Sequence, residues 1–173
     1  MDTDTATLVA RLGRIVGQDR VVVDPEECAY LSQDAFWDGA VAAIAIRPAN
    51  SQALADSLAA ASAAGFASVP RGGGMSYTRG YVPTRERSVI VDCRDLDRIV
   101  TINADDLYVT AEAGCTWLQL YTALKPLGLR TPYFGPMSGR FATVGGALSQ
   151  NSMFYGSAQY GTVAESVLGI EVA

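Results

Sequence analysis

Two glycine-rich segments carry the residues whose types and spacing could do chemistry. The first, PRGGGMSY at residues 70–77, follows a short apolar run that predicts a strand. Consecutive glycines permit positive φ angles and close approach of a ligand, and a row of exposed N–H groups binds anions. A diphosphate suits such a loop, because each N–H donated to a charged oxygen contributes about 1.5–3 kcal/mol. Ser76 adds a hydroxyl donor and Tyr77 an aromatic wall.

The second segment runs from Gly135 to Gly161 and is rich in glycine, serine and other small residues. Gly145 and Gly146 are expected to expose further main-chain donors, and the small side chains leave room for a flat ring system. Two plainer interpretations stay open. Three glycines by themselves are also typical of a tight turn, and the second segment could be a long surface loop, although such loops are uncommon in compact domains.

Other chemistry is excluded by what the chain lacks. It has no histidine, the commonest general base and metal ligand, and its three cysteines form no CxxC pair, so no metal site is expected. The first loop has neither the GK[ST] of a mononucleotide loop nor the GxGxxG that opens a Rossmann helix. A formal charge of −5 offers no basic surface for nucleic acid. The adjacent Asp105 and Asp106 predict a hairpin turn without a catalytic role.

The elements that must position the two segments follow from hydrophobic periodicity and from breakers. Ser51 is expected to cap a helix of small residues, and the order strand, helix, strand ahead of the first loop predicts parallel strands. The expected helices span residues 5–17, 51–64 and 117–125, and the expected strands span residues 40–47, 66–70, 88–93, 98–103, 107–114 and 167–172. A further short strand and one or two helical turns are expected within residues 21–32. No stretch reaches the ~18 apolar residues that a membrane-spanning helix needs.

Together these blocks resemble the FAD-binding domain of the vanillyl-alcohol oxidase and p-cresol methylhydroxylase superfamily, from about Arg47 to Val172. The block RPANSQALADSLAAASAAGFASVPRGGGMSY resembles its strand, helix and first diphosphate loop, and ATVGGALSQNSMFYGSAQYGTVAESVLGIEV resembles its second. The branch of glycolate oxidase and D-lactate dehydrogenase flavoprotein subunits is the nearest in pattern. The resemblance implies an α+β fold of the p-cresol methylhydroxylase type, with a small parallel βαβ lobe and a second, mixed or antiparallel lobe.

The expected organisation is a helical lead-in at 1–40 and an FAD-binding domain at 41–173, with lobes at about 41–92 and 93–173. The chain ends inside an expected strand, which favours a C-terminal truncation that also leaves out the family's cap domain. A soluble, cytoplasmic protein that associates with a further domain or subunit is expected.

The resemblance also implies how FAD is held. The diphosphate would lie on residues 71–77 and 142–146, the adenine near Val163 and 168–172, and the isoalloxazine near Pro136, Gly139 and 149–151. Met75 stands where many relatives have a histidine that bonds the flavin, so noncovalent FAD is expected. The full set of expected cofactor residues is Pro70, Arg71, Gly72, Gly73, Gly74, Met75, Ser76, Tyr77, Pro136, Gly139, Ala142, Thr143, Val144, Gly145, Gly146, Ser149, Asn151, Tyr160, Gly161, Val163 and Val172.

The function that the resemblance implies is transfer of hydride from a 2-hydroxy acid or alcohol to flavin N5, with an electron acceptor that the sequence does not name. Catalytic residues are not assigned, because in this family they come largely from the cap domain. Two alternatives stay open. One is a non-catalytic flavin- or nucleotide-binding module, and the other is a relative of the NADPH-dependent enolpyruvyl reductase, which shares the fold.

Overall fold

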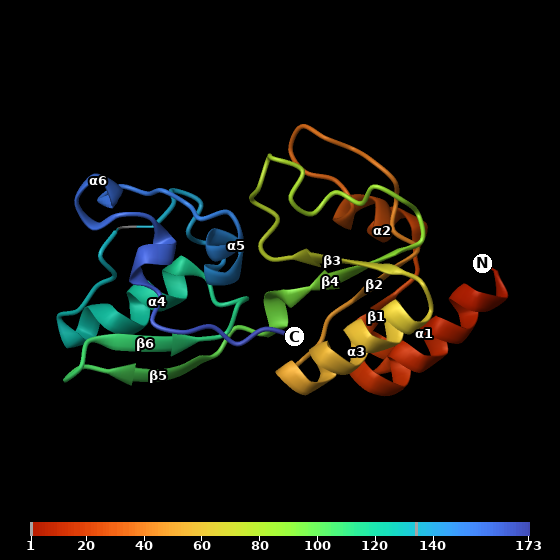
Figure 1. Ribbon diagram of the computed structural model, residues 1–173, viewed down its shortest axis with the longest axis horizontal. Coiled ribbons are helices and arrows are strands. Elements are labelled where there is room, and N and C mark those ends of the chain that lie inside the picture. Colours follow the sequence, from red (N-terminus) through yellow and green to blue (C-terminus); the bar gives the residue numbers. More distant parts are fainter. Residues whose placement is uncertain (1, 134) are drawn as a thin grey trace. The chain divides into compact units, whose positions relative to one another are not determined.

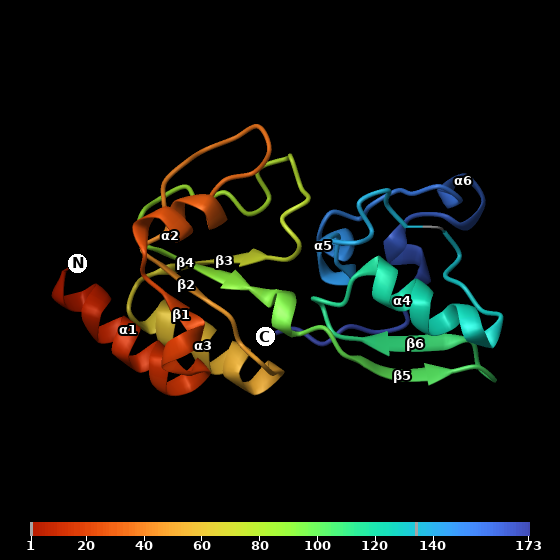
Figure 2. The same cartoon turned by 180° about the vertical axis from the view of Figure 1, so that it is seen from behind.

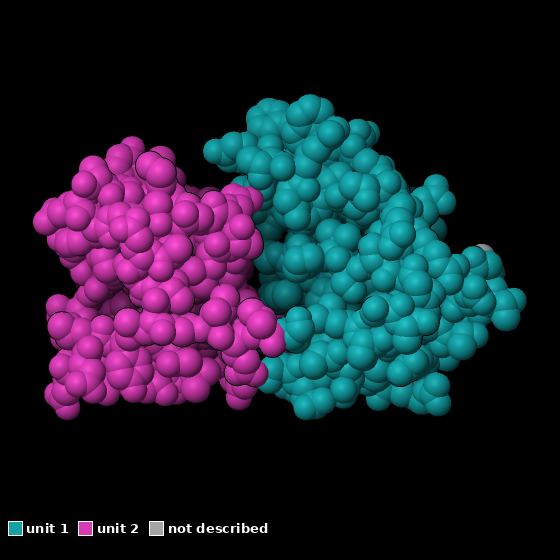
Figure 3. All heavy atoms as spheres, viewed as in Figure 1, with its two compact units in different colours: residues 1–95, 173 teal, residues 96–172 magenta. Residues whose placement is uncertain are grey.

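The computed structural model describes residues 2–133 and 135–173 and divides the chain into two compact units. Unit 1 runs to Asp95 and also takes in Ala173, and unit 2 runs from Leu96 to Val172 (Figure 3). The elements of unit 1 are α1 (Thr3–Val16), η1 (Gln18–Arg20), β1 (Val21–Val22), α2 (Pro25–Leu31), β2 (Ile44–Ile46), α3 (Ser51–Ala63), β3 (Ala67–Arg71), β4 (Ser88–Asp92) and η2 (Cys93–Asp95).

The sheet of unit 1 has the strand order β1-β2-β4-β3 (Figure 1). Strands β2 and β3 both pair in parallel with β4, which lies between them, whereas β1 pairs antiparallel with β2. The predicted parallel strand, helix and strand are therefore confirmed. Parallel strands end at the same edge of a sheet, so the end of β3 at Arg71 lies beside the end of β4 at Asp92.

Helices cover both faces of this sheet (Figures 1 and 2). Successive side chains of a strand point to opposite faces, so Ile44 and Ile46 pack with α1 and α3, while Ala45 packs on the other side with Leu31 of α2. The three residues of β2 are all buried. Burial of apolar surface on both faces is the main force that fixes β2 in the sheet.

Helix α1 is part of this core rather than a separate extension. Its apolar residues at helical spacing, Leu8, Leu12 and Val16, are buried with Phe66 and the sheet. Residues 1–40, set apart as a lead-in on sequence grounds, lie within unit 1.

The predicted cap of α3 is wrong by one residue. The side chain of Asn50 accepts the N–H of Ala53, and Ser51 is already the first helical residue. Asparagine caps a helix as well as serine does, and Asn50 has the extended backbone that a capping residue needs.

Unit 2 contains a hairpin followed by short helices. Asn103 Oδ1 accepts the N–H groups of Asp105 and Asp106, which makes the predicted turn between the strands. The core of unit 2 contains an aromatic cluster of Trp117, Tyr133 and Phe154 in edge-to-face contact. The elements are β5 (Ile99–Asn103), β6 (Tyr108–Ala111), α4 (Trp117–Leu124), η3 (Lys125–Leu127), α5 (Val144–Ser149), α6 (Ser157–Tyr160) and η4 (Val163–Ser166).

The predicted strand at 167–172 is absent. Residues 167–173 have no regular structure, and Leu168, Ile170 and Val172 are exposed. An apolar alternation forms a strand only when a neighbouring strand satisfies its N–H and C=O groups, and no described strand pairs with this stretch. Among the described residues no helix is both long and apolar enough to cross a membrane.

Candidate cofactor site

The first glycine loop follows β3, and several of its main-chain N–H groups form no hydrogen bond among the described residues. Gly74 has a φ of 69°, in the left-handed region that glycine adopts without strain. Within the described residues, the N–H groups of Gly73, Gly74 and Met75 donate to no acceptor of the chain. Consecutive unpaired main-chain donors are the arrangement that binds an anion, and they are the feature that the sequence predicts here.

Tyr81 contacts two carbonyl groups of this loop. Its buried hydroxyl lies within hydrogen-bond distance of the carbonyl oxygens of Gly74, at 2.8 Å, and Ser76, at 3.3 Å. The hydroxyl therefore serves two carbonyl groups of the loop, whereas the N–H groups of Gly73, Gly74 and Met75 stay unpaired among the described residues. Tyr81 was not among the predicted residues, since only the folded chain brings its side chain under a loop that precedes it.

A second missed residue, Asp34, ties the end of the loop to the segment after α2. Its carboxylate accepts the N–H groups of Phe36 and Trp37, both at 2.9 Å, and that of Arg79, also at 2.9 Å. The Arg79 guanidinium stacks 3.8 Å from the centre of the Trp37 ring. These contacts link two segments 45 residues apart, so no local sequence pattern could have indicated them.

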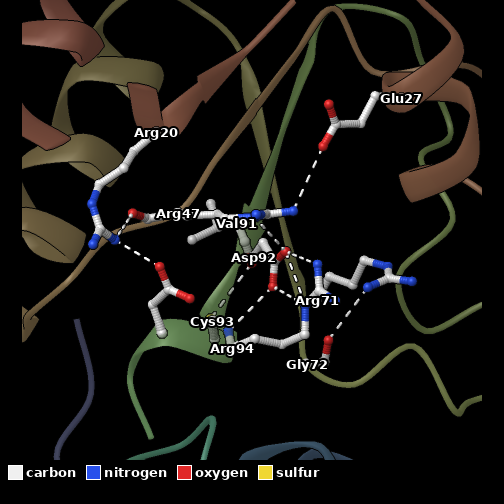
Figure 4. A network of polar contacts seen from close by, with 10 residues as sticks. Arg20, Glu27, Arg47, Arg71, Gly72, Val91, Asp92, Cys93 and Arg94 are labelled. Atoms are coloured by element: carbon white, nitrogen blue, oxygen red, sulfur yellow. Dashed lines mark hydrogen bonds and ion pairs between the residues drawn. The ribbon is translucent and has the colours of Figure 1, made fainter. Parts of the chain in front are cut away.

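The end of β4 carries a buried carboxylate beside the loop (Figure 4). Asp92 is fully buried and accepts hydrogen bonds from Arg94 Nε, at 2.9 and 3.0 Å, and from Arg47 Nε, at 3.2 Å. Burial alone would raise the pKa of Asp92, but the hydrogen bonds and charges of Arg94 and Arg47 hold it below its ordinary value. The carboxylate is thus ionised and satisfied within the chain.

Arg71 is buried, whereas the sequence left a phosphate contact, a salt bridge and solvent exposure open for it. Among the described residues it forms no ion pair, and its guanidinium lies 5.2 Å from the ring centre of Tyr81 and 5.9 Å from that of Tyr30. The structure therefore places a buried cation, without an ion pair among the described residues, at the start of the loop.

The second segment differs from its prediction. The expectation that Gly145 and Gly146 expose main-chain donors is wrong: Gly145 N–H donates to Ala113 O at 2.8 Å, and Gly146 N–H to Thr143 Oγ1 at 3.2 Å. These glycines lie in the first turn of α5, whose N–H groups need acceptors, and the chain supplies them.

Helices α4 and α5 satisfy each other's first turns. The N–H groups of Trp117 and Leu118 donate to carbonyls of the segment before α5, and those of Val144 and Gly145 donate to carbonyls of the segment before α4. Gly145 also has a packing role, because a Cβ there would lie 2.7 Å from the Ala113 Cβ and 2.8 Å from its carbonyl oxygen.

The remaining predicted residues of unit 2 are dispersed over it. Ser149 donates its hydroxyl to Gly146 O, and Asn151 accepts the N–H of Ala164. Val163 is buried with Tyr133, whose hydroxyl donates to the Val163 carbonyl. The others are Pro136, Gly139 and Ala142 in the turn before α5, Tyr160 and Gly161 at the end of α6, and the exposed Val172.

A shallow hollow of about 470 Å³ lies away from the predicted cofactor residues. Its lining residues are Arg11, Arg14, Ile15, Asp56 and Ala59 of α1 and α3. No group of described residues could hold a metal ion. Burial raises the pKa of the Cys93 and Cys115 thiols to about 11, so neither is a reactive thiolate at neutral pH.

A glycine loop with free amides beside a buried cation defines a domain that binds an anionic cofactor. The chain matches the family of FAD-binding domains over residues 42–173, and it belongs to that family. The resemblance drawn from the two glycine-rich segments is confirmed. FAD is the cofactor of the family, and the free amides of the first loop fit its diphosphate.

Relatives by sequence are oxidoreductases by name. The chain is 27% identical over 180 residues to the uncharacterized FAD-linked oxidoreductase YgcU of Escherichia coli (strain K12), with 99% of this chain and 37% of that protein covered. It is 29% identical to the glycolate oxidase subunit GlcD of Bacillus subtilis (strain 168), over 73% of this chain and 27% of GlcD. It is 36% identical to the D-2-hydroxyglutarate dehydrogenase of Escherichia coli (strain K12), over 58% of this chain and 10% of that enzyme.

Solved structures share the fold. Alkyldihydroxyacetonephosphate synthase superposes with a TM-score of 0.83 at 17% identity, over 94% of this chain and 35% of the other. p-Cresol methylhydroxylase superposes with a TM-score of 0.76 at 15% identity, over 87% of this chain and 30% of the other. The predicted α+β fold of the p-cresol methylhydroxylase type is confirmed. The chain spans about a third of the length of each of these proteins.

Proposed function

We propose that this chain is the FAD-binding part of an oxidoreductase that takes hydride from a 2-hydroxy acid or an alcohol. Membership of the FAD-binding family supports the cofactor, and the names of GlcD and the D-2-hydroxyglutarate dehydrogenase support a hydroxy acid as substrate. The observation that carries the proposal is the row of unpaired amides at Gly73, Gly74 and Met75. Bound FAD supplies the hydride-accepting atom, and the protein supplies binding and orientation.

The cofactor contacts that we propose are given for each unit by itself. The first loop, residues 70–77, donates main-chain N–H groups to the diphosphate. In unit 2 the contacts come from side chains and carbonyls rather than from the amides of Gly145 and Gly146. The proposed contacts there are Pro136, Gly139, 142–146, Ser149, Asn151, Tyr160, Gly161, Val163 and Val172.

We further propose that the flavin is held without a covalent bond. The chain has no histidine, and Met75, in the loop, has a thioether without a transferable proton. Cys28 and Cys115 are buried, and burial raises the pKa of both thiols. Acid precipitation of the purified protein should therefore release all of its flavin into the supernatant.

The visible spectrum of the purified protein tests the function. A yellow protein with bands near about 370 and 450 nm, as flavins show, is expected, and anaerobic addition of 2-hydroxy acids should bleach the band at longer wavelength. Bands that no hydroxy acid or alcohol bleaches would instead indicate a non-catalytic binding module. Bleaching by NADPH alone would indicate a reductase of the enolpyruvyl type. A colourless protein that takes up no added FAD would contradict the proposal.

A further inference from the structure

Arg71 is a buried cation that forms no ion pair with any described residue. Only 6% of its surface is exposed, and its Nε atom has no hydrogen-bond partner. Its one hydrogen bond within the described residues is a long contact of 3.5 Å from Nη1 to the carbonyl oxygen of Gly72 (Figure 4). A buried charge that lacks both an ion pair and a full set of hydrogen bonds is costly, so its retention needs a reason.

The neighbouring carboxylate stabilises the charge of Arg71 only in part and forms no ion pair with it. Asp92 is its partner in the register of β3 and β4, yet the Asp92 oxygens accept from Arg94 and Arg47. Both of those arginines are partly exposed and reach the carboxylate from other elements. Burial lowers the pKa of Arg71 by more than the charge of Asp92 raises it, so the cation is only partly stabilised in the cofactor-free chain.

The guanidinium of Arg71 is packed directly against the glycine loop. A Cβ on Gly74 would lie within 3 Å of the guanidinium carbon and of Nη2, so a side chain at this position would displace the guanidinium. The rings of Tyr81 and Tyr30 lie beside the guanidinium, and the Tyr81 hydroxyl donates a hydrogen bond to the Gly74 carbonyl oxygen. The unpaired N–H groups of the loop therefore lie next to the buried charge of Arg71.

We propose that Arg71 is the electrostatic anchor of the first loop, and that the diphosphate of the bound nucleotide is its missing counter-ion. The inference rests on the proposed function, because it assigns to Arg71 a share of FAD binding. It is specific to the diphosphate, since a cation beneath the loop acts on the anion and not on the flavin ring. Tyr30 and Tyr81 hold the guanidinium in place in the absence of the cofactor.

The test is a set of binding and unfolding measurements on the purified apoprotein and its Arg71→Met variant. Titration calorimetry with FAD, with ADP, which carries a diphosphate but no flavin, and with riboflavin, which carries a flavin but no phosphate, separates the two ends of the cofactor. The variant should bind FAD and ADP about 10- to 100-fold more weakly, as expected for the loss of one charge-assisted contact, and should bind riboflavin as the parent does. Arg71→Lys should recover part of the ADP affinity.

The stability of the apoprotein distinguishes the proposed binding role of Arg71 from a merely structural one. Arg71→Met removes an unpaired buried charge and keeps an apolar chain between the tyrosines, so the apoprotein should unfold at the same or a higher urea concentration. Arg85→Met, at an exposed arginine, is the matched control for the change in net charge and should leave all affinities unchanged.

Equal losses of riboflavin and ADP affinity, or a destabilised apoprotein with unchanged ADP affinity, would overturn the proposal for Arg71. Its failure is distinguishable from that of the proposed function. If the parent protein binds ADP through Arg71 but takes up no FAD, the anchor stands and the flavoprotein assignment falls. If it binds FAD and ADP with the same affinity whether residue 71 is arginine or methionine, the assignment stands and the anchor falls.

Discussion

Asp92 is the carboxylate on which the end of β4 depends, and replacing it should lower the free energy of unfolding. Asp92→Asn leaves Arg94 and Arg47 without their anion and should lower the free energy of unfolding at pH 7 by about 2 kcal/mol, less than for a fully buried pair because both arginines reach solvent. Asp95→Asn, which breaks the exposed pair with Arg20, is the control and should cost less than about 1 kcal/mol. Urea unfolding followed by circular dichroism measures both.

The same pair of proteins gives a pH dependence with a defined sign. The folded pKa of Asp92 is lowered, so its stabilisation is fully present above the unfolded pKa of about 3.9 and is lost as pH falls through the lower folded pKa. The gap in stability between the parent and Asp92→Asn should therefore be constant from pH 7 to about 5 and shrink below about pH 4. A gap that widens on acidification would contradict this account.

Gly145 is required by packing, whatever it does for the cofactor. Gly145→Ala places a Cβ within 3 Å of Ala113 backbone and side chain, so the start of α5 must move, and the expected loss of stability is about 1–3 kcal/mol. In Gly146→Ala the nearest atom is the Thr143 hydroxyl at 3.2 Å, and a change below about 1 kcal/mol is expected. The comparison is made on apoprotein. If Gly145 served only cofactor approach, the Gly145→Ala apoprotein would be as stable as the parent.

At the scale of elements, α4 and α5 depend on each other because each supplies carbonyls to the first turn of the other. Thr116 adds a side-chain cap to α4 and forms a capping box with Gln119. Thr116→Ala should therefore lower the free energy of unfolding by about 1 kcal/mol, and Thr116→Ser, which keeps the hydroxyl, should lower it by much less. Thermal unfolding of the three proteins checks this. Equal melting temperatures for the alanine variant and the parent would show that the backbone contacts alone hold the helix.

At the scale of the whole molecule, local chemistry determined most of what the sequence predicted. Helical spacing of apolar residues predicted α1, α3 and α4, and the glycines of 72–74 predicted a loop with free amides. The polar pair Asp105 and Asp106 predicted a turn, in which their N–H groups donate to the side chain of Asn103. These features depend on residues close together in the chain. For the same reason the family could be recognised from two short blocks.

Tertiary structure decided the features that depend on distant partners. The expected strand at 167–172 has no neighbour with which to pair, and the amides of Gly145 and Gly146 are taken by Ala113 and Thr143. A buried Arg71 that forms no ion pair with any described residue is likewise invisible in the sequence, because its burial is set by Tyr30 and Tyr81, which come from other parts of the chain. Hydrogen bonds and charges are satisfied in space, and a linear pattern specifies only the groups that need partners.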